Sequence, residues 1–133
     1  MLQSIVDTHA VIWYIFADSR LSNIARMTIE QAATDGYQVG FSSITLAEII
    51  YLSEKGRIPP LTLNQLLAEV DRPNSVLMEV PFNRQIAQTM QSIDRAQVPD
   101  LPDRIIAATA LYHNIPLISR DRKIQLSTIN TIW

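Results

Sequence analysis

Short apolar runs of strand length recur along the chain, and a segment that favours a helix follows most of them. The runs occupy residues 3–6, 37–41, 75–80, 115–119 and 130–133. Strands that alternate with helices form a parallel sheet with helices on both faces, joined by right-handed crossovers. The pattern therefore predicts an α/β fold with a central, mainly parallel sheet of four to five strands.

Helix signals fill the segments between these runs. Thr8 is a suitable N-cap for a helix over residues 8–16, although a segment this apolar is also compatible with a strand. Ser22 and Gly36 fit the start and the end of a helix that reaches Thr34. Further helices are predicted from Ser42 or Ser43 to Lys55, over 61–70, from Asn83 to Asp94 or Arg95, and from Pro102 to His113.

Length and composition restrict the class of protein. A chain of 133 residues, 47% of them apolar, fits one globular domain over residues 1–133. No apolar stretch approaches the ~20 residues that span a membrane, and a cytoplasmic protein is expected. The lack of cysteine excludes disulfides and thiolate zinc sites. A net charge of −2 gives no general sign of nucleic-acid binding.

Four acidic residues stand at the edges of apolar segments, where a carboxylate is costly unless it is paired, hydrogen-bonded or bound to a metal. They are Asp7, Glu48, Asp103 and Asp121. Two follow predicted strands, and two lie in the first turns of predicted helices. The ligand site of an open parallel sheet lies beyond the carboxyl ends of its strands, where helices also begin. All four carboxylates are therefore expected at one edge of the sheet.

The type of acid cluster indicates a metal site. Clustered carboxylates repel each other unless a cation neutralises them. The only nearby histidine or cysteine is His9, which is more readily explained as a structural residue. An all-oxygen site favours Mg²⁺ or Mn²⁺ over zinc, and such ions assist displacement at phosphorus. The four acids are therefore predicted to be both metal ligands and catalytic residues.

Each acid also has a purely structural explanation. Asp7 can end a strand, and Asp121 can pair with a neighbouring arginine. Asp103 can occupy position N3 of a helix that Asp100 caps. Glu48 is the hardest to explain in this way, because its helical neighbours at i−4, i+3 and i+4 are of the core type. The metal-site interpretation gains weight because it accounts for all four at once.

Hydroxyls and aromatic rings near the predicted edge are less specific. Thr8, Ser43 and Ser119 can orient carboxylates, but each also fits a cap or turn position, as does Asp100 at the rim. The aromatic residues near the acids are expected in the core, although one of them can line a groove; they are Trp13, Tyr14 and Tyr51.

Three arginines adjoin the acids along the chain: Arg104, Arg120 and Arg122. If the acids cluster, these cations lie beside the cluster and suit a phosphate-bearing substrate. For each of them taken alone, ordinary solvated surface charge is the better explanation.

Four segments resemble the motifs of PIN-domain ribonucleases, and most closely those of the VapC toxins of type II toxin–antitoxin systems. They are IVDTHAVIW at 5–13, SITLAEI at 43–49, PDLPDRIIAATA at 99–110 and LISRDRKI at 117–124. Their order and spacing agree with the family over the whole chain. One departure is Leu101-Pro102, which stands where a Pro–aromatic pair is common and which alters a groove wall without removing either aspartate.

The resemblance implies a three-layer α/β/α sandwich and Mg²⁺- or Mn²⁺-dependent cleavage of RNA. It carries the metal-site roles onto the four acids and a supporting role onto Ser119. It also implies a homodimer that binds a small antitoxin protein. Two alternatives differ in class: a non-catalytic PIN-fold regulatory or binding module, which four intact acids disfavour, and a receiver-type phosphotransfer domain, which needs an acid pair where Asp7 stands alone.

Overall fold

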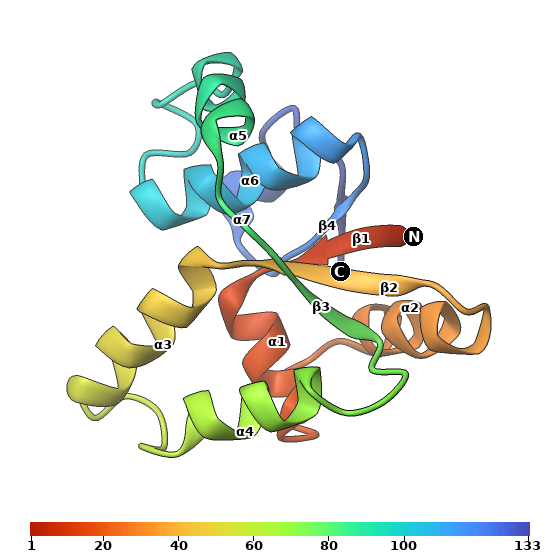
Figure 1. Ribbon diagram of the computed structural model, residues 1–133. Coiled ribbons are helices and arrows are strands. Elements are labelled where there is room, and N and C mark those ends of the chain that lie inside the picture. Colours follow the sequence, from red (N-terminus) through yellow and green to blue (C-terminus); the bar gives the residue numbers. More distant parts are fainter.

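The computed structural model describes residues 1–133 as alternating strands and helices with one 3₁₀ turn (Figure 1). The elements are β1 Leu2–Val6, α1 Thr8–Ile15, α2 Asn23–Thr34, β2 Gln38–Ser42, α3 Ile44–Glu54, α4 Thr62–Val70, β3 Leu77–Val80, α5 Arg84–Thr89, η1 Met90–Ser92, α6 Leu101–His113, β4 Leu117–Ile118, α7 Arg122–Gln125 and β5 Thr131–Ile132.

The five strands form one sheet in the order β3-β2-β1-β4-β5, and every pairing is parallel. The predicted α/β fold and its parallel sheet are confirmed. β1 is the central strand, and Val6 pairs with Ile118 at the end of β4. The chain first builds the sheet outward from β1 through β2 to β3, then continues on the other side of β1 with β4 and β5. The carboxyl ends of β1 and β4 therefore meet at the switch in direction.

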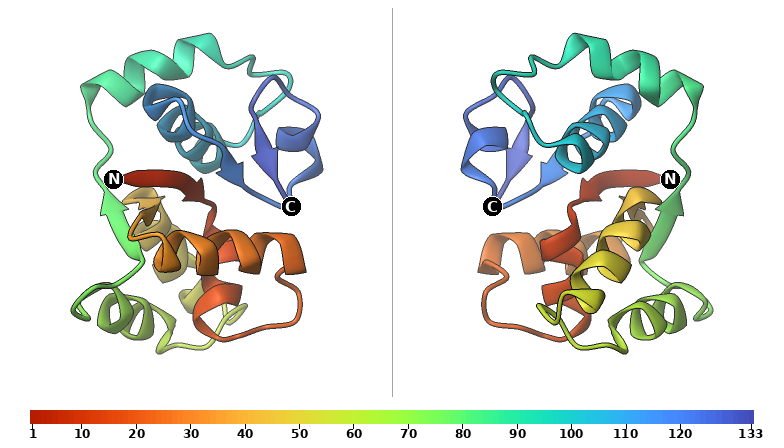
Figure 2. Two further views of the ribbon diagram at one scale, coloured as in Figure 1. Left: turned by 90° about the vertical axis from the view of Figure 1, so that its right-hand side faces the viewer. Right: turned by 90° about the vertical axis from the view of Figure 1, so that its left-hand side faces the viewer.

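Helices cover both faces of the sheet, with α1 to α4 on one side and α5 to α7 on the other (Figures 1 and 2). Two buried apolar clusters match these layers. The larger, of 17 residues, packs α1 to α4 against the sheet, and the smaller, of 12, packs α5 to α7 against the opposite face. No helix is both long and apolar enough to cross a membrane.

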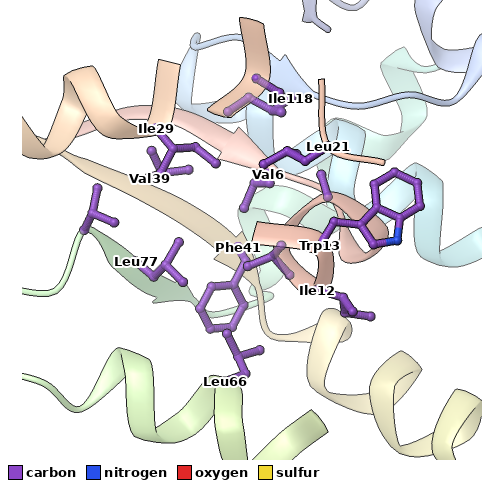
Figure 3. Close-up of a cluster of buried hydrophobic side chains, with 14 of the residues drawn as sticks. Val6, Ile12, Trp13, Leu21, Ile29, Val39, Phe41, Leu66, Leu77 and Ile118 are labelled. Atoms are coloured by element: carbon purple, nitrogen blue, oxygen red, sulfur yellow. The ribbon is translucent and has the colours of Figure 1, made fainter. Parts of the chain in front are cut away.

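The larger cluster anchors the elements that carry two of the acids. Phe41 of β2 belongs to it and points toward Leu66 of α4, and both side chains are fully buried (Figure 3). Trp13 of α1 belongs to the same cluster and is only 7% exposed. Burial of such side chains stabilises the fold by about 1.5–3 kcal/mol each. It also fixes α1 and α3 against the sheet. The N-terminal parts of these two helices, which carry Asp7 and Glu48, are thereby held in place.

The structure differs from the predicted helices in two places. The helix expected from Asn83 to Asp94 or Arg95 is α5 followed by a short 3₁₀ turn, because two carbonyls near its end accept hydrogen bonds from Arg104. The short helix α7 was not expected, since four residues give no detectable periodicity. Asp121 caps this helix.

The start of α3 agrees with the expected cap at Ser42 or Ser43, whereas the position of Tyr51 differs from expectation. Ser43 forms no side-chain cap, whereas the hydroxyl of Ser42 accepts the backbone N–H of Ile44 at 3.2 Å. Tyr51 was expected in the core but is 56% exposed. The buried residues of α3 are Thr45, Ile49 and Leu52, so position 51 faces outward.

Candidate active site

A cavity of about 440 Å³ opens at the carboxyl edge of the sheet, next to the ends of β1 and β4. Ligands of open parallel sheets bind at such a switch in strand order. The structure brings all four predicted acids together here. The nine residues that line the cavity are Asp7, Thr8, His9, Trp13, Glu48, Asp100, Asp103, Arg120 and Asp121.

Asp7 follows β1 directly and is held by two hydrogen bonds to the backbone. Its backbone N–H donates to the carbonyl of Ile118 over 3.0 Å, which fixes the end of β1 against the end of β4. Its carboxylate accepts the backbone N–H of Ala10 at 3.0 Å, and the nearby hydroxyl of Ser119 opposes the rise in its pKa. Asp7, rather than Thr8 as expected, is therefore the N-cap of α1, because its short side chain reaches the N–H at N3.

Ser119 also holds the last of the four acids. The backbone N–H of Asp121 donates to the Ser119 Oγ at 3.0 Å. Oδ1 of Asp121 in turn accepts the backbone N–H groups of Lys123 and Ile124 at 2.8 and 3.2 Å. The Ser119 side chain is fully buried. One buried hydroxyl thus stabilises the turn that carries Asp121 and lies near the carboxylate of Asp7.

Glu48 reaches the cavity from the second turn of α3 and is half-buried. Its Oε1 accepts the hydroxyl proton of Thr8 at 2.5 Å. The Thr8 Oγ1 also lies 3.0 Å from the Oγ1 of Thr45, and both threonines are buried. Thr8 therefore supports one of the acids, but that acid is Glu48 rather than Asp7, its neighbour in the sequence.

Asp103 lies at N3 of α6. Oδ2 of Asp100, the N-cap, accepts the backbone N–H of Asp103 at 3.1 Å. Asp100 thus caps α6 with Asp103 at N3, which is the structural explanation considered for Asp103. Both side chains nevertheless line the cavity, so this arrangement and a place in the acid cluster are compatible.

Burial and mutual repulsion disfavour the ionised forms of three of these carboxyls. Burial, followed by repulsion from Asp100 and then from the other acids, raises the pKa of Asp103 to about 7. Burial also raises the pKa values of Asp7 and Glu48, although a hydroxyl hydrogen bond to each opposes the rise. A nearby cation would favour the ionised form of every one of them.

The donor set fits a hard divalent cation. Five carboxylates face one guanidinium and one imidazole across the cavity, and Mg²⁺ and Mn²⁺ prefer oxygen ligands. As the side chains stand, no three Asp, Glu or His residues converge closely enough to hold an ion. Asp7 and Asp121 are turned toward backbone N–H groups. Ion binding therefore requires some of the carboxylates to rotate inward.

The three arginines expected beside the acids lie in different places. Arg120 lines the cavity, and its Cζ lies 5.6 Å from the centroid of the Trp13 ring. Arg104 instead donates to two backbone carbonyls of the segment before α6, at 3.0 and 3.3 Å. Neither Arg104 nor Arg122 lines the cavity. Of the three, Arg120 alone is placed to meet a substrate there.

Two residues assigned structural roles from the sequence also line the cavity. His9 is exposed at its margin, and its ring lies 5.8 Å from that of Trp13. The two rings stand four residues apart on the helix that Asp7 caps, a spacing that places them on one face. This spacing of four residues was the sequence signal that could have placed His9 and Trp13 together beside the cavity. Ser43, by contrast, does not line the cavity, and its hydroxyl accepts the backbone N–H of Phe82 at 3.0 Å.

The family model described as the PIN domain matches residues 4–127. The chain therefore belongs to the PIN-domain family, as its four motifs indicated. Among individual relatives, the ribonuclease VapC22 of Mycobacterium tuberculosis is 30% identical to it over 129 residues, which cover 94% of this chain and 92% of that protein.

Solved structures share the fold over almost the whole chain. VapBC2 from Rickettsia felis, bound to a DNA fragment from its promoter, matches with a TM-score of 0.71 at 18% identity and covers 98% of this chain and 97% of that one. The DNA-bound VapBC from Salmonella typhimurium matches with a TM-score of 0.68 at 24% identity, with coverage of 98% and 97%. The PIN fold of this chain is thus established by sequence and by structure.

Proposed function

We propose that this protein is an endoribonuclease that depends on Mg²⁺ or Mn²⁺, with Asp7, Glu48, Asp103 and Asp121 as its metal ligands and catalytic residues. The observation that carries the proposal is the gathering of all four acids in one cavity at the switch in strand order. Similarity to the ribonuclease VapC22 supports RNA as the substrate.

The side chains suit the hydrolysis of a phosphodiester. A bound divalent ion would supply activation of water and stabilisation of the charge that develops on phosphate oxygens. The four carboxylates would hold and orient it. Thr8 keeps Glu48 in place, and Ser119 holds the turn that carries Asp121. Asp100, at the rim, adds negative charge and caps the helix that carries Asp103.

Arg120 is proposed to bind a phosphate of the RNA. The guanidinium is exposed and lies over the face of Trp13, whose ring attracts the cation and limits its positions. A planar guanidinium binds phosphate through two parallel hydrogen bonds. A substrate phosphate at this position would lie within the same cavity as the acids.

The proposed biological role is that of the toxin in a VapBC-type pair, with a small antitoxin protein as partner. The neighbours in structure are VapBC complexes, which supports such a partner. A homodimer in the cytoplasm is proposed on the family resemblance.

Cleavage of RNA by the purified protein tests this proposal. Wild-type protein should cut single-stranded RNA with Mg²⁺ or Mn²⁺, and excess EDTA should abolish cleavage. Asp103→Asn should lower the rate at least about a hundredfold, since a lost charge on a catalytic metal ligand is costly. Asp35→Asn, at the exposed end of α2, is the matched control. Cleavage that survives both EDTA and Asp103→Asn would show a contaminating nuclease or another mechanism.

A further inference from the structure

The hydroxyl of Thr45 lies behind the acid cavity rather than in it. Thr45 is fully buried in the first turn of α3 and is not among the residues that line the cavity. Its Oγ1 is 3.0 Å from that of Thr8, which in turn is 2.5 Å from the Oε1 of Glu48. The three side chains form a continuous hydrogen-bonded chain from the core to the acid cluster.

Counting protons fixes the direction of this chain. A hydroxyl has one proton to donate, whereas an ionised carboxylate can only accept. Because Thr8 gives its proton to Glu48, the Thr8 oxygen must accept the proton of Thr45. Thr45 therefore has one role open to it while Glu48 is ionised, as a donor to Thr8.

The hydroxyl of Thr45 also behaves differently from those of other helical threonines in the chain. Threonine hydroxyls inside helices commonly donate to the carbonyl four residues earlier. Four threonines here do so: Thr28, Thr34, Thr89 and Thr109. Thr45, in the first turn of α3, has no helical carbonyl four residues before it, and it bonds instead to a side chain of another element, Thr8 at the start of α1. The hydroxyl of Thr45 thus makes a tertiary contact. Its partner, Thr8, directly follows Asp7, and Thr45 itself stands three residues before Glu48.

We propose that Thr45 is a positioning residue, which sets the orientation of the Glu48 carboxylate through Thr8. This inference rests on the proposed function, in which Glu48 is a metal ligand. Donation from Thr45 fixes the rotation of the Thr8 hydroxyl, and that hydroxyl ties the carboxylate on α3 to the junction of β1 and α1. Partners of ligating carboxylates control metal affinity because they hold the ligand in place.

Three matched substitutions separate the hydroxyl from the packing around it. Thr45→Val keeps the shape and loses the hydroxyl, and Thr45→Ser keeps the hydroxyl and loses a methyl group. Thr109→Val removes a hydroxyl that is equally buried but bonds only to the carbonyl of Ile105 in its own helix. All three should fold, as judged by thermal unfolding.

The readouts are the Mn²⁺ dissociation constant from calorimetry, kcat and KM for RNA cleavage, and crystal structures of the two Thr45 variants. Thr45→Val should weaken Mn²⁺ binding about tenfold and lower kcat with little change in KM. Thr45→Ser and Thr109→Val should stay within about twofold of wild type. In the crystals, Glu48 should keep its rotamer in Thr45→Ser and leave it in Thr45→Val.

The outcomes distinguish this inference from the proposed function. If wild type neither binds Mn²⁺ nor cleaves RNA, the proposed function fails, and the Glu48 rotamers in the two crystals still decide whether Thr45 positions that side chain. If wild type is active and Thr45→Val matches it, only the role of Thr45 is overturned. Equal losses in Thr45→Val and Thr45→Ser, or in Thr109→Val, would assign the effect to packing and also overturn it.

Discussion

The buried hydroxyl of Ser119 lies beside the carboxylate of Asp7 and opposes the rise in its pKa, although the two residues are separated by most of the chain. The same oxygen accepts the backbone N–H of Asp121 at 3.0 Å. One side chain after β4 therefore lies beside an acid after β1 and stabilises the turn that carries another. This contact exists because β1 and β4 pair in parallel and end together.

Loss of this hydroxyl should impair the site more than the fold. In Ser119→Ala, we expect Mn²⁺ affinity and kcat to fall by about tenfold or more, since the turn that carries Asp121 loses the hydroxyl that accepts its backbone N–H. The free energy of unfolding should fall by only about 1–2 kcal/mol, the usual effect of one lost buried hydrogen bond. Ser127→Ala is the control, because Ser127 makes similar turn contacts outside the cavity. A similar loss of activity in both variants would contradict a specific role for Ser119.

Without a divalent ion, the protein should lose stability as the pH rises from about 4 to about 7. Asp103 has a folded-state pKa raised from 3.8 to about 7, so in this window the folded protein retains a proton that the unfolded chain has released. The raised pKa values of Asp7 and Glu48 act in the same direction. The effect of Asp103 should be on the order of 1 kcal/mol after allowance for solvent screening.

The measurement is thermal unfolding in EDTA and in saturating Mn²⁺ across this pH range. Mn²⁺ should reduce or reverse the loss, because ion binding requires deprotonated ligands. Asp103→Asn should flatten the profile recorded in EDTA. An EDTA profile of wild type that rises through this window would contradict the predicted sign.

Arg120 should contribute a phosphate contact that depends on salt. For single-stranded RNA, each neutralised phosphate contributes about 0.7 to the slope of log affinity against log salt. In Arg120→Ala, this slope should therefore decrease by about 0.7, measured as RNA binding in Ca²⁺ to prevent cleavage. Arg122→Ala tests the geometry, since Arg122 does not line the cavity and should change the slope less. Equal slopes for wild type and Arg120→Ala would exclude this contact.

Gly40 should tolerate no side chain, because β2 passes close to its neighbours there. A Cβ on Gly40 would lie 2.7 Å from Cγ2 of Val80 and 3.1 Å from Cδ1 of Ile5. Val80 is β-branched and cannot easily turn away. Gly40→Ala should reduce the free energy of unfolding by about 1–3 kcal/mol, as overpacked cores do. Chemical denaturation checks this, and a variant as stable as wild type would show that the sheet relaxes.

Much of the fold and site followed from local patterns. The alternation of apolar runs with helix signals was enough to predict the sheet, and the places of Asp7 and Asp121 after strands were enough to bring them to one edge. Asp103 at N3 followed from capping chemistry alone. These inferences succeeded because each depends on a few adjacent residues and on the common direction of parallel strands.

The missed features depend on long-range packing. Arg104 stands next to Asp103 in sequence, but its side chain reaches the carbonyls of Met90 and Ile93, and no local pattern shows where that segment lies. Tyr51 has the composition of a core residue and is exposed because the inward face of α3 is set by its neighbours. The link between Thr45 and Thr8 likewise joins two elements that only the folded chain brings together.

Titration of the purified protein with Mn²⁺ by calorimetry tests the central claim most directly, because it measures whether the acids at the end of β1 and the start of α6 bind a divalent ion. Wild type should bind one or two ions, and Asp7→Asn and Asp103→Asn should each weaken binding at least about tenfold. Asp35→Asn, outside the cavity, should bind as wild type does. Equal Mn²⁺ binding by wild type, Asp7→Asn and Asp103→Asn, or no binding by any of them, would contradict a metal site built on these carboxylates.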